Sequence, residues 1–131
     1  MQSSISRVFV YGTLKRGGRA NHLMQDKSAI LGWHITPAEY TLKDLGYFPG
    51  VELNGKDVVQ GEVYQISDDL LDELDYLENY PHMYERKLID TPYGPAWMYY
   101  LSPDSAWHGR PNCIIEDGIW NVKDVNVDKP F

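Results

Sequence analysis

Only one long stretch of this sequence, residues 67–80 (SDDLLDELDYLENY), has the leucine spacing of an amphipathic helix. Ser67 stands at the N-cap position, acidic residues fill the first turn, and Pro81 ends the pattern. The remaining apolar runs are short, rich in β-branched and aromatic residues, and bounded by Gly, Pro or Asn. The sequence therefore predicts several strands and one substantial helix, which is an α+β fold.

The predicted strands are connected mostly as hairpins. We expect a buried strand at 7–12, extended chain over 28–42 interrupted at Pro37, and a turn at 44–50. A hairpin of 51–53 and 58–66 should follow around Asn54-Gly55. We also expect a second hairpin of 83–91 and 95–102, and one more strand in the tail from 114 to 127. Such pairing predicts a mostly antiparallel or mixed sheet that can curl into a barrel.

Composition narrows the function classes. The 131 residues show no internal repeat or low-complexity stretch, so we expect a single domain over 1–131. A net charge of −7 disfavours binding to nucleic acid or to an anionic membrane. The single cysteine, Cys113, cannot form an internal disulfide, no signal peptide is visible, and the apolar run 96–101 is too short to span a membrane. We therefore expect a cytoplasmic protein.

Glu78 is the anomaly of the predicted helix. With Leu70 at zero, Glu78 lies at about 80° on the helical wheel, between Leu74 at about 40° and Leu71 at about 100°. The five other acids of residues 68–77 lie outside this apolar arc. Burial would raise the pKa of this carboxyl and make it a usable proton acceptor and donor. Alternatively, the side chain can swing out to solvent at the frayed helix end or pair with Arg86.

The segment 8–18 (VFVYGTLKRGG) places glycines between a strand and a short predicted helix. Successive backbone N–H groups in such a turn can hold an anion, although an ordinary strand-to-helix turn has the same pattern. The segment is neither a Walker A loop nor a dinucleotide fingerprint, because Gly18-Arg19 replaces Lys-Ser/Thr and G-x-G-x-x-G is absent.

Other candidate residues stay open to two interpretations. Tyr84 and Arg86 share one face of a strand, where they can line a pocket or pair across the sheet. Lys15, Arg16 and Arg19 can steer an anionic substrate or form a solvated loop. Trp97, Tyr99 and Tyr100 have the pattern of core and rim residues. The four histidines and one cysteine lack the spacing of zinc ligands, and no G-x-S-x-G serine hydrolase motif occurs.

Two motifs together resemble the γ-glutamylcyclotransferase-like family, in its AIG2-like and γ-glutamylamine cyclotransferase branch. They are VFVYGTLKRG near the N-terminus and LDYLENYPHMYER in the middle, and the resemblance extends over residues 7–121. It implies a compact mixed barrel flanked by helices, with Glu78 as the catalytic residue. It also implies that Tyr11, Gly12, Thr13 and Leu14 form the substrate loop. The family often has Gly after the catalytic Glu, where this chain has Asn79, a residue that tolerates the left-handed conformation of a helix end.

The resemblance further implies a cofactor-independent reaction that releases 5-oxoproline from a small γ-glutamyl compound, with no metal. Glu78 would transfer the protons, Tyr11 to Leu14 would grip the substrate, and Tyr84 is included as a substrate-binding candidate. A binding module of the same fold that captures a metabolite or a protein, or a scaffold that uses only its surface, stays open as an alternative. The sequence identifies neither the leaving amine nor the oligomeric state.

Overall fold

The computed structural model of the chain describes residues 5–16, 21–24, 28–45, 48–105, 114–115 and 117–120. In chain order these residues form β1 (Ile5–Val10), the 3₁₀ helix η1 (Asn21–Met24), β2 (Ser28–Ile35), β3 (Tyr40–Asp44), β4 (Pro49–Leu53), β5 (Gln60–Ser67), α1 (Asp68–Leu77), β6 (Tyr84–Ile89), β7 (Ala96–Leu101) and β8 (Ile114–Ile115). None of the described helices is long and apolar enough to cross a membrane.

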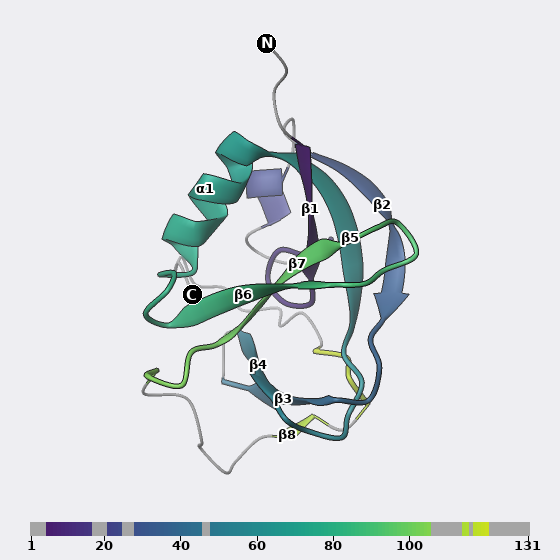
Figure 1. The fold of residues 1–131 in the computed structure, drawn as a ribbon, viewed down its shortest axis with the longest axis vertical. Coiled ribbons are helices and arrows are strands. Elements are labelled where there is room, and N and C mark those ends of the chain that lie inside the picture. Colours follow the sequence, from purple (N-terminus) through teal and green to yellow (C-terminus); the bar gives the residue numbers. More distant parts are fainter. Residues whose placement is uncertain are drawn as a thin grey trace.

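The strands form a five-stranded sheet in the order β2-β5-β1-β7-β6 and a three-stranded sheet in the order β4-β3-β8 (Figure 1). All pairs are antiparallel except β1 with β7, which is parallel. The predicted α+β class with a mixed, mostly antiparallel sheet is therefore confirmed. The described strands are paired in two sheets rather than one continuous ring, but β4 also packs against β7, where Gly50 lies under Leu101.

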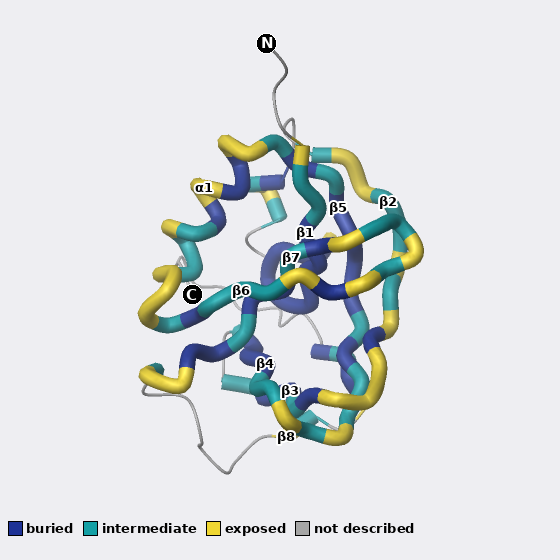
Figure 2. Tube along the Cα trace, in the orientation of Figure 1, coloured by how far each residue is buried: buried dark blue, intermediate teal, exposed yellow. Residues whose placement is uncertain are grey.

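The helix packs its leucines against the larger sheet. Ser67 accepts a hydrogen bond from the backbone N–H of Leu70, as expected for the predicted N-cap. Leu70, Leu71 and Leu74 are buried in a cluster with residues of β1, β5, β6 and β7. Figure 2 shows the buried interior and, within it, the loop that follows β1. The helix end and this loop are thus attached to the same core.

The predicted hairpin around Asn54-Gly55 is wrong in its pairing. Asn54 does adopt the left-handed conformation, with φ of 67°, but β4 pairs with β3 instead of β5. The backbone N–H of Gly55 binds the carbonyl of Glu39, and β5 pairs with β1 and β2. The turn chemistry therefore determines only the local reversal of the chain, whereas burial of the β5 side chains between β1 and β2 decides its partners.

The other strand predictions agree with the structure in part: β1 ends at Val10 rather than at residue 12, and β4 begins at Pro49, inside the segment 44–50 that is predicted to be a turn. Residues 28–42 are extended with a break at Pro37, and β6 and β7 form the second hairpin, with Tyr84 opposite Leu101. The predicted tail strand is present only as β8, which pairs with β3. The rest of that prediction, from residue 121 onward, lies outside the described residues.

Candidate active site

Glu78 is the C-cap of α1, where the helix turns toward β6. Its backbone N–H still binds the carbonyl of Leu74 at 2.9 Å, and Asn79 follows in the left-handed conformation, with φ of 53°. The expectation that Asn79 can replace glycine at this turn is therefore confirmed. Because Leu74 is anchored in the core, the turn directs the Glu78 side chain inward.

The loop after β1 lies opposite this helix end and is tightly closed. The N–H of Lys15 binds the carbonyl of Gly12 at 3.0 Å, and the amide of Asn21 binds the carbonyl of Leu14 at 2.7 Å. The backbone N–H groups of Gly12, Thr13 and Leu14 have no hydrogen-bond partner among the described residues. These three donors are therefore available to an anionic or carbonyl oxygen.

Gly12 is needed at this point of the loop because of its close neighbour. A Cβ atom at this position would stand 2.7 Å from both Cδ and Cγ of Pro49. The loop can therefore approach β4 this closely only with glycine.

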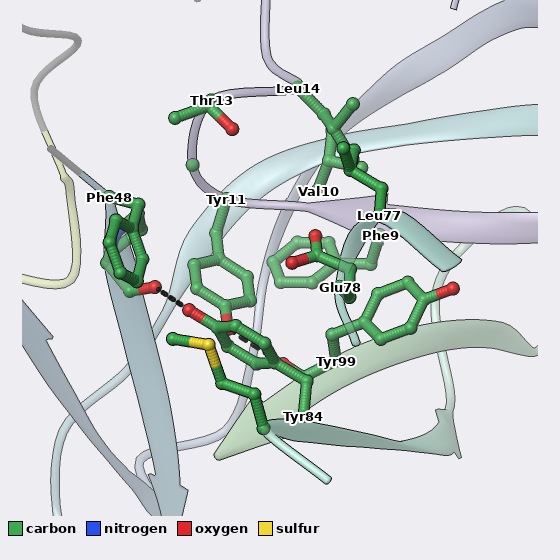
Figure 3. Close-up of a pocket in the computed structure, with 13 residues that line it drawn as sticks. Phe9, Val10, Tyr11, Thr13, Leu14, Phe48, Leu77, Glu78, Tyr84 and Tyr99 are labelled. Atoms are coloured by element: carbon green, nitrogen blue, oxygen red, sulfur yellow. Dashed lines mark hydrogen bonds between the residues drawn. The ribbon is translucent and has the colours of Figure 1, made fainter. Parts of the chain in front are cut away.

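The loop and the helix end form two walls of one cavity (Figure 3). Its volume is about 540 Å³, including the open mouth. The lining combines one carboxylate with mostly apolar and aromatic side chains: Phe9, Val10, Tyr11, Gly12, Thr13, Leu14, Phe48, Pro49, Leu77, Glu78, Met83, Tyr84 and Tyr99. All six predicted site residues, Glu78, Tyr11, Gly12, Thr13, Leu14 and Tyr84, therefore line the same cavity.

The Glu78 carboxyl group points into this cavity. Burial raises its pKa to about 7, and the negative charge of Asp75 contributes in the same direction. Desolvation disfavours the charged form of a carboxyl group, so Glu78 can both accept and donate a proton near neutral pH. The structure thus agrees with the inward orientation, and burial makes Glu78 hold its proton to higher pH than an exposed carboxyl group would.

Two tyrosines stiffen the walls around Glu78. The hydroxyl of Tyr11 donates to the carbonyl of Tyr99 at 2.7 Å, and the hydroxyl of Tyr84 donates to the carbonyl of Pro49 at 2.7 Å. Burial raises the pKa of both phenols, with Glu78 adding to the effect. Both tyrosines thus stay protonated and present their rings, rather than a free hydroxyl, to the cavity.

The alternative that Arg86 pairs with Glu78 is wrong. Arg86 binds Asp75 instead, with Nε–Oδ1 and Nη2–Oδ2 distances of 2.8 and 3.0 Å. Tyr99 also donates its hydroxyl to Asp75 Oδ1 at 2.6 Å. Sequence reasoning missed Asp75 because the wheel placed it outside the leucine arc, and only its position three residues before Glu78 hinted at a role.

Of the basic cluster, the structure describes Lys15 and Arg16, and both are bound to other parts of the chain. Lys15 is 6% exposed and donates to the carbonyl of Trp120 at 2.8 Å. Arg16 is exposed but binds buried Glu62 through its backbone N–H and Nε, both at 2.9 Å. Arg19 lies outside the described residues. Lys15 thus fastens the loop to the segment around Trp120, and Arg16 fastens it to β5.

The site offers no clear metal ligands. No group of three or more His, Cys, Asp or Glu side chains in the described parts of the chain could hold a metal ion. The arrangement instead combines a carboxyl group whose pKa is raised to about 7, loop N–H groups with no partner in the described part of the chain, and rigid apolar walls. These groups can bind a small polar molecule and move a proton on it.

Comparison with known proteins matches this sequence to one family. Residues 8–122 match the sequence profile described as "Gamma-glutamyl cyclotransferase, AIG2-like". A protein of Vibrio cholerae is 42% identical over 113 residues, which cover 86% of this chain and 93% of the relative. The "Gamma-glutamylcyclotransferase family protein YtfP" of Escherichia coli K12 is 39% identical over 119 residues, which cover 90% of this chain and 98% of that protein.

Solved structures show the same fold. The crystal structure of an AIG2-like protein from Mus musculus superposes with a TM-score of 0.72 at 26% identity, and covers 89% of this chain and 88% of that one. The solution structure of protein ytfP from Escherichia coli superposes with a TM-score of 0.68 at 39% identity, with coverage of 87% and 95%.

Proposed function

Because the chain belongs to the γ-glutamyl cyclotransferase, AIG2-like family, we propose that it releases 5-oxoproline from a small γ-glutamyl compound, with Glu78 as its general acid and base. The observation that carries this proposal is the cavity itself. It sets a carboxyl group with a pKa of about 7 opposite the Gly12–Leu14 loop, whose N–H groups bind no other described residue.

The reaction is an intramolecular aminolysis and needs no water or cofactor. The α-amine nitrogen of the γ-glutamyl group attacks its own side-chain amide carbon. A new C–N bond closes the five-membered lactam, and the old amide C–N bond breaks to release the amine. The α-amine attacks in its neutral form, after its ammonium proton has been lost to the solvent. Glu78 then takes one proton from the attacking nitrogen and returns it to the leaving nitrogen, so a single carboxyl group completes the proton balance.

The loop and the walls supply the rest of the catalysis. The N–H groups of Gly12, Thr13 and Leu14 would hold the substrate carboxylate or the oxyanion that forms at the amide. The rings of Tyr11 and Tyr84 would keep the chain curled, since both are fixed by hydrogen bonds to backbone carbonyls. Intramolecular reactions held in a productive geometry reach effective molarities of about 10⁵ M or more, so positioning removes much of the barrier.

The direct test is Glu78→Gln, which keeps the shape of the side chain and removes the acid. We expect the variant to fold and to lose at least about 100-fold in turnover, the lower range of a general acid–base contribution. The assay incubates parent and variant with a panel of γ-glutamyl amides and γ-glutamyl amino acids and quantifies 5-oxoproline by mass spectrometry. Glu73→Gln, an exposed glutamate on the same helix, is the matched control and should keep the parent rate.

The panel also separates catalysis from simple binding. Release of 5-oxoproline by Glu78→Gln at the parent rate would show that Glu78 is not the base. Binding of a γ-glutamyl compound to the parent without product, with equal affinity in the variant, would instead assign the cavity to a binding module.

A further inference from the structure

Building on the function proposed above, we propose that Asp75 is a positioning residue that, with Arg86 as its counter-charge, sets the pH at which Glu78 exchanges its proton. Asp75 is not itself one of the residues that line the cavity, but it accepts a hydrogen bond from the lining residue Tyr99. Its charge would act on the reaction through Glu78, the C-cap of α1, which follows it by three residues.

Asp75 is held rigidly by two other elements. Arg86 of β6 donates hydrogen bonds to both of its carboxylate oxygens, and the hydroxyl of Tyr99 of β7 donates to Oδ1. The pair is largely shielded, with side-chain exposure of 16% for Arg86 and 18% for Asp75. The Arg86 guanidinium carbon lies 4.2 Å from the centre of the Trp97 ring and 5.0 Å from that of Tyr80. Rings on two sides thus fix the cation that holds the carboxylate.

Elements on every side of Glu78 contribute groups that face it or its neighbour. Helix α1 contributes Asp75, the loop after β1 contributes Tyr11, β6 contributes Tyr84 and Arg86, and β7 contributes Tyr99. The three phenols donate their hydroxyl protons within the protein and stay neutral. Of these described groups, Asp75 and Arg86 carry charge at neutral pH.

These two charges act on Glu78 with opposite signs. A negative Asp75 disfavours ionisation of Glu78 and makes it hold its proton to higher pH. A positive Arg86 offsets part of that repulsion because it is bound directly to Asp75. Removing either partner should therefore shift the titration of Glu78, and the two shifts should have opposite directions. A purely structural pair would give no such pattern.

The experiment compares the acidic limb of the kcat/KM profile in Asp75→Asn and Arg86→Gln. Asp75→Asn should move the limb to lower pH and Arg86→Gln to higher pH, each by about 0.5 unit or more, the size expected for a charge one helical turn away in a partly screened site. Arg86→Lys keeps the charge and should return the limb toward its parent position. Asp72→Asn on the exposed face of α1 and Lys87→Gln next to Arg86 in β6 are the matched controls, in which the limb should not move.

A second measurement does not depend on turnover. Carbon-13 NMR of protein labelled at the glutamate carboxyl follows the titration of Glu78 directly, its resonance being assigned by its loss in Glu78→Gln. Opposite shifts in Asp75→Asn and Arg86→Gln support the inference, whereas shifts in one direction or none overturn it. If no γ-glutamyl compound yields 5-oxoproline, the proposed function fails, but this titration still decides the role of Asp75.

Discussion

The raised pKa of Glu78 predicts that its replacement will stabilise the protein, and only above acidic pH. A carboxyl group whose pKa is higher in the folded than in the unfolded chain binds its proton more tightly when folded. Its contribution is therefore fully favourable below the unfolded pKa and is lost as pH rises through the folded pKa. For Glu78 this window extends from 4.5 to about 7. Glu78→Gln has no such proton to lose.

The size of the effect follows from the width of that window. One pKa unit corresponds to about 1.4 kcal/mol, so a rise from 4.5 to about 7 corresponds to about 3 kcal/mol. Glu78 is only half-buried as a residue and its cavity opens to solvent, so screening reduces the expected value to about 2 kcal/mol. Small proteins have total free energies of unfolding of about 5–15 kcal/mol, so a change of about 2 kcal/mol is large enough to measure.

Urea unfolding of the parent and of Glu78→Gln at several values between pH 4.5 and 8.5 measures this quantity directly. Other groups titrate alike in both proteins, so they cancel in the difference between the two free energies of unfolding. That difference should grow in favour of the variant by about 2 kcal/mol up to pH 7 and then level off. A difference that stays constant with pH, or that moves toward the parent, would refute the buried and proton-holding state of Glu78.

Two further predictions concern the loop opposite Glu78. Gly12→Ala introduces a Cβ 2.7 Å from Pro49, and we expect a folded protein whose kcat/KM for 5-oxoproline release falls at least about tenfold, because misplacing a substrate-binding group costs up to about 100-fold. An unchanged kcat/KM would argue against the loop as the substrate site. Glu62→Gln places an amide donor against the N–H groups of Arg16, so we expect KM to rise several-fold and the free energy of unfolding in urea to fall by about 1–3 kcal/mol. A change in stability without a change in KM would confine Glu62 to a structural role.

The parts of the fold that depend on local sequence patterns could be predicted. Ser67, the leucines of α1 and Pro81 define the helix because N-capping, amphipathic spacing and chain termination are local effects. The pairing of β4 could not be predicted in this way. Asn54-Gly55 specifies a reversal, but the partner strand depends on which side chains are buried together after the whole chain has collapsed.

The site was also predictable where its residues stand out in a local sequence pattern. Glu78 is conspicuous because a carboxylate on an apolar arc breaks a local pattern, and the Tyr11–Leu14 loop is conspicuous through its glycine and its position after a strand. Asp75 and Glu62 leave no such mark, since their roles depend on Arg86 and Arg16, which lie 11 and 46 residues away. The role of such a charged residue can be recognised only when the fold shows which residue it pairs with.

The position of Glu78 at the very end of α1 unites these observations. Burial, the charge of Asp75 and the negative end of the helix dipole all disfavour the carboxylate form. A γ-glutamyl compound carries an α-amine that is mostly protonated near neutral pH, because free α-amino groups have pKa values of about 8. Its arrival would bring a positive charge to Glu78 and would favour transfer of that proton through the Glu78 carboxyl group. The electrostatic imbalance by which Glu78 lowers the stability of the protein is thus the same one that would make it a base for this substrate.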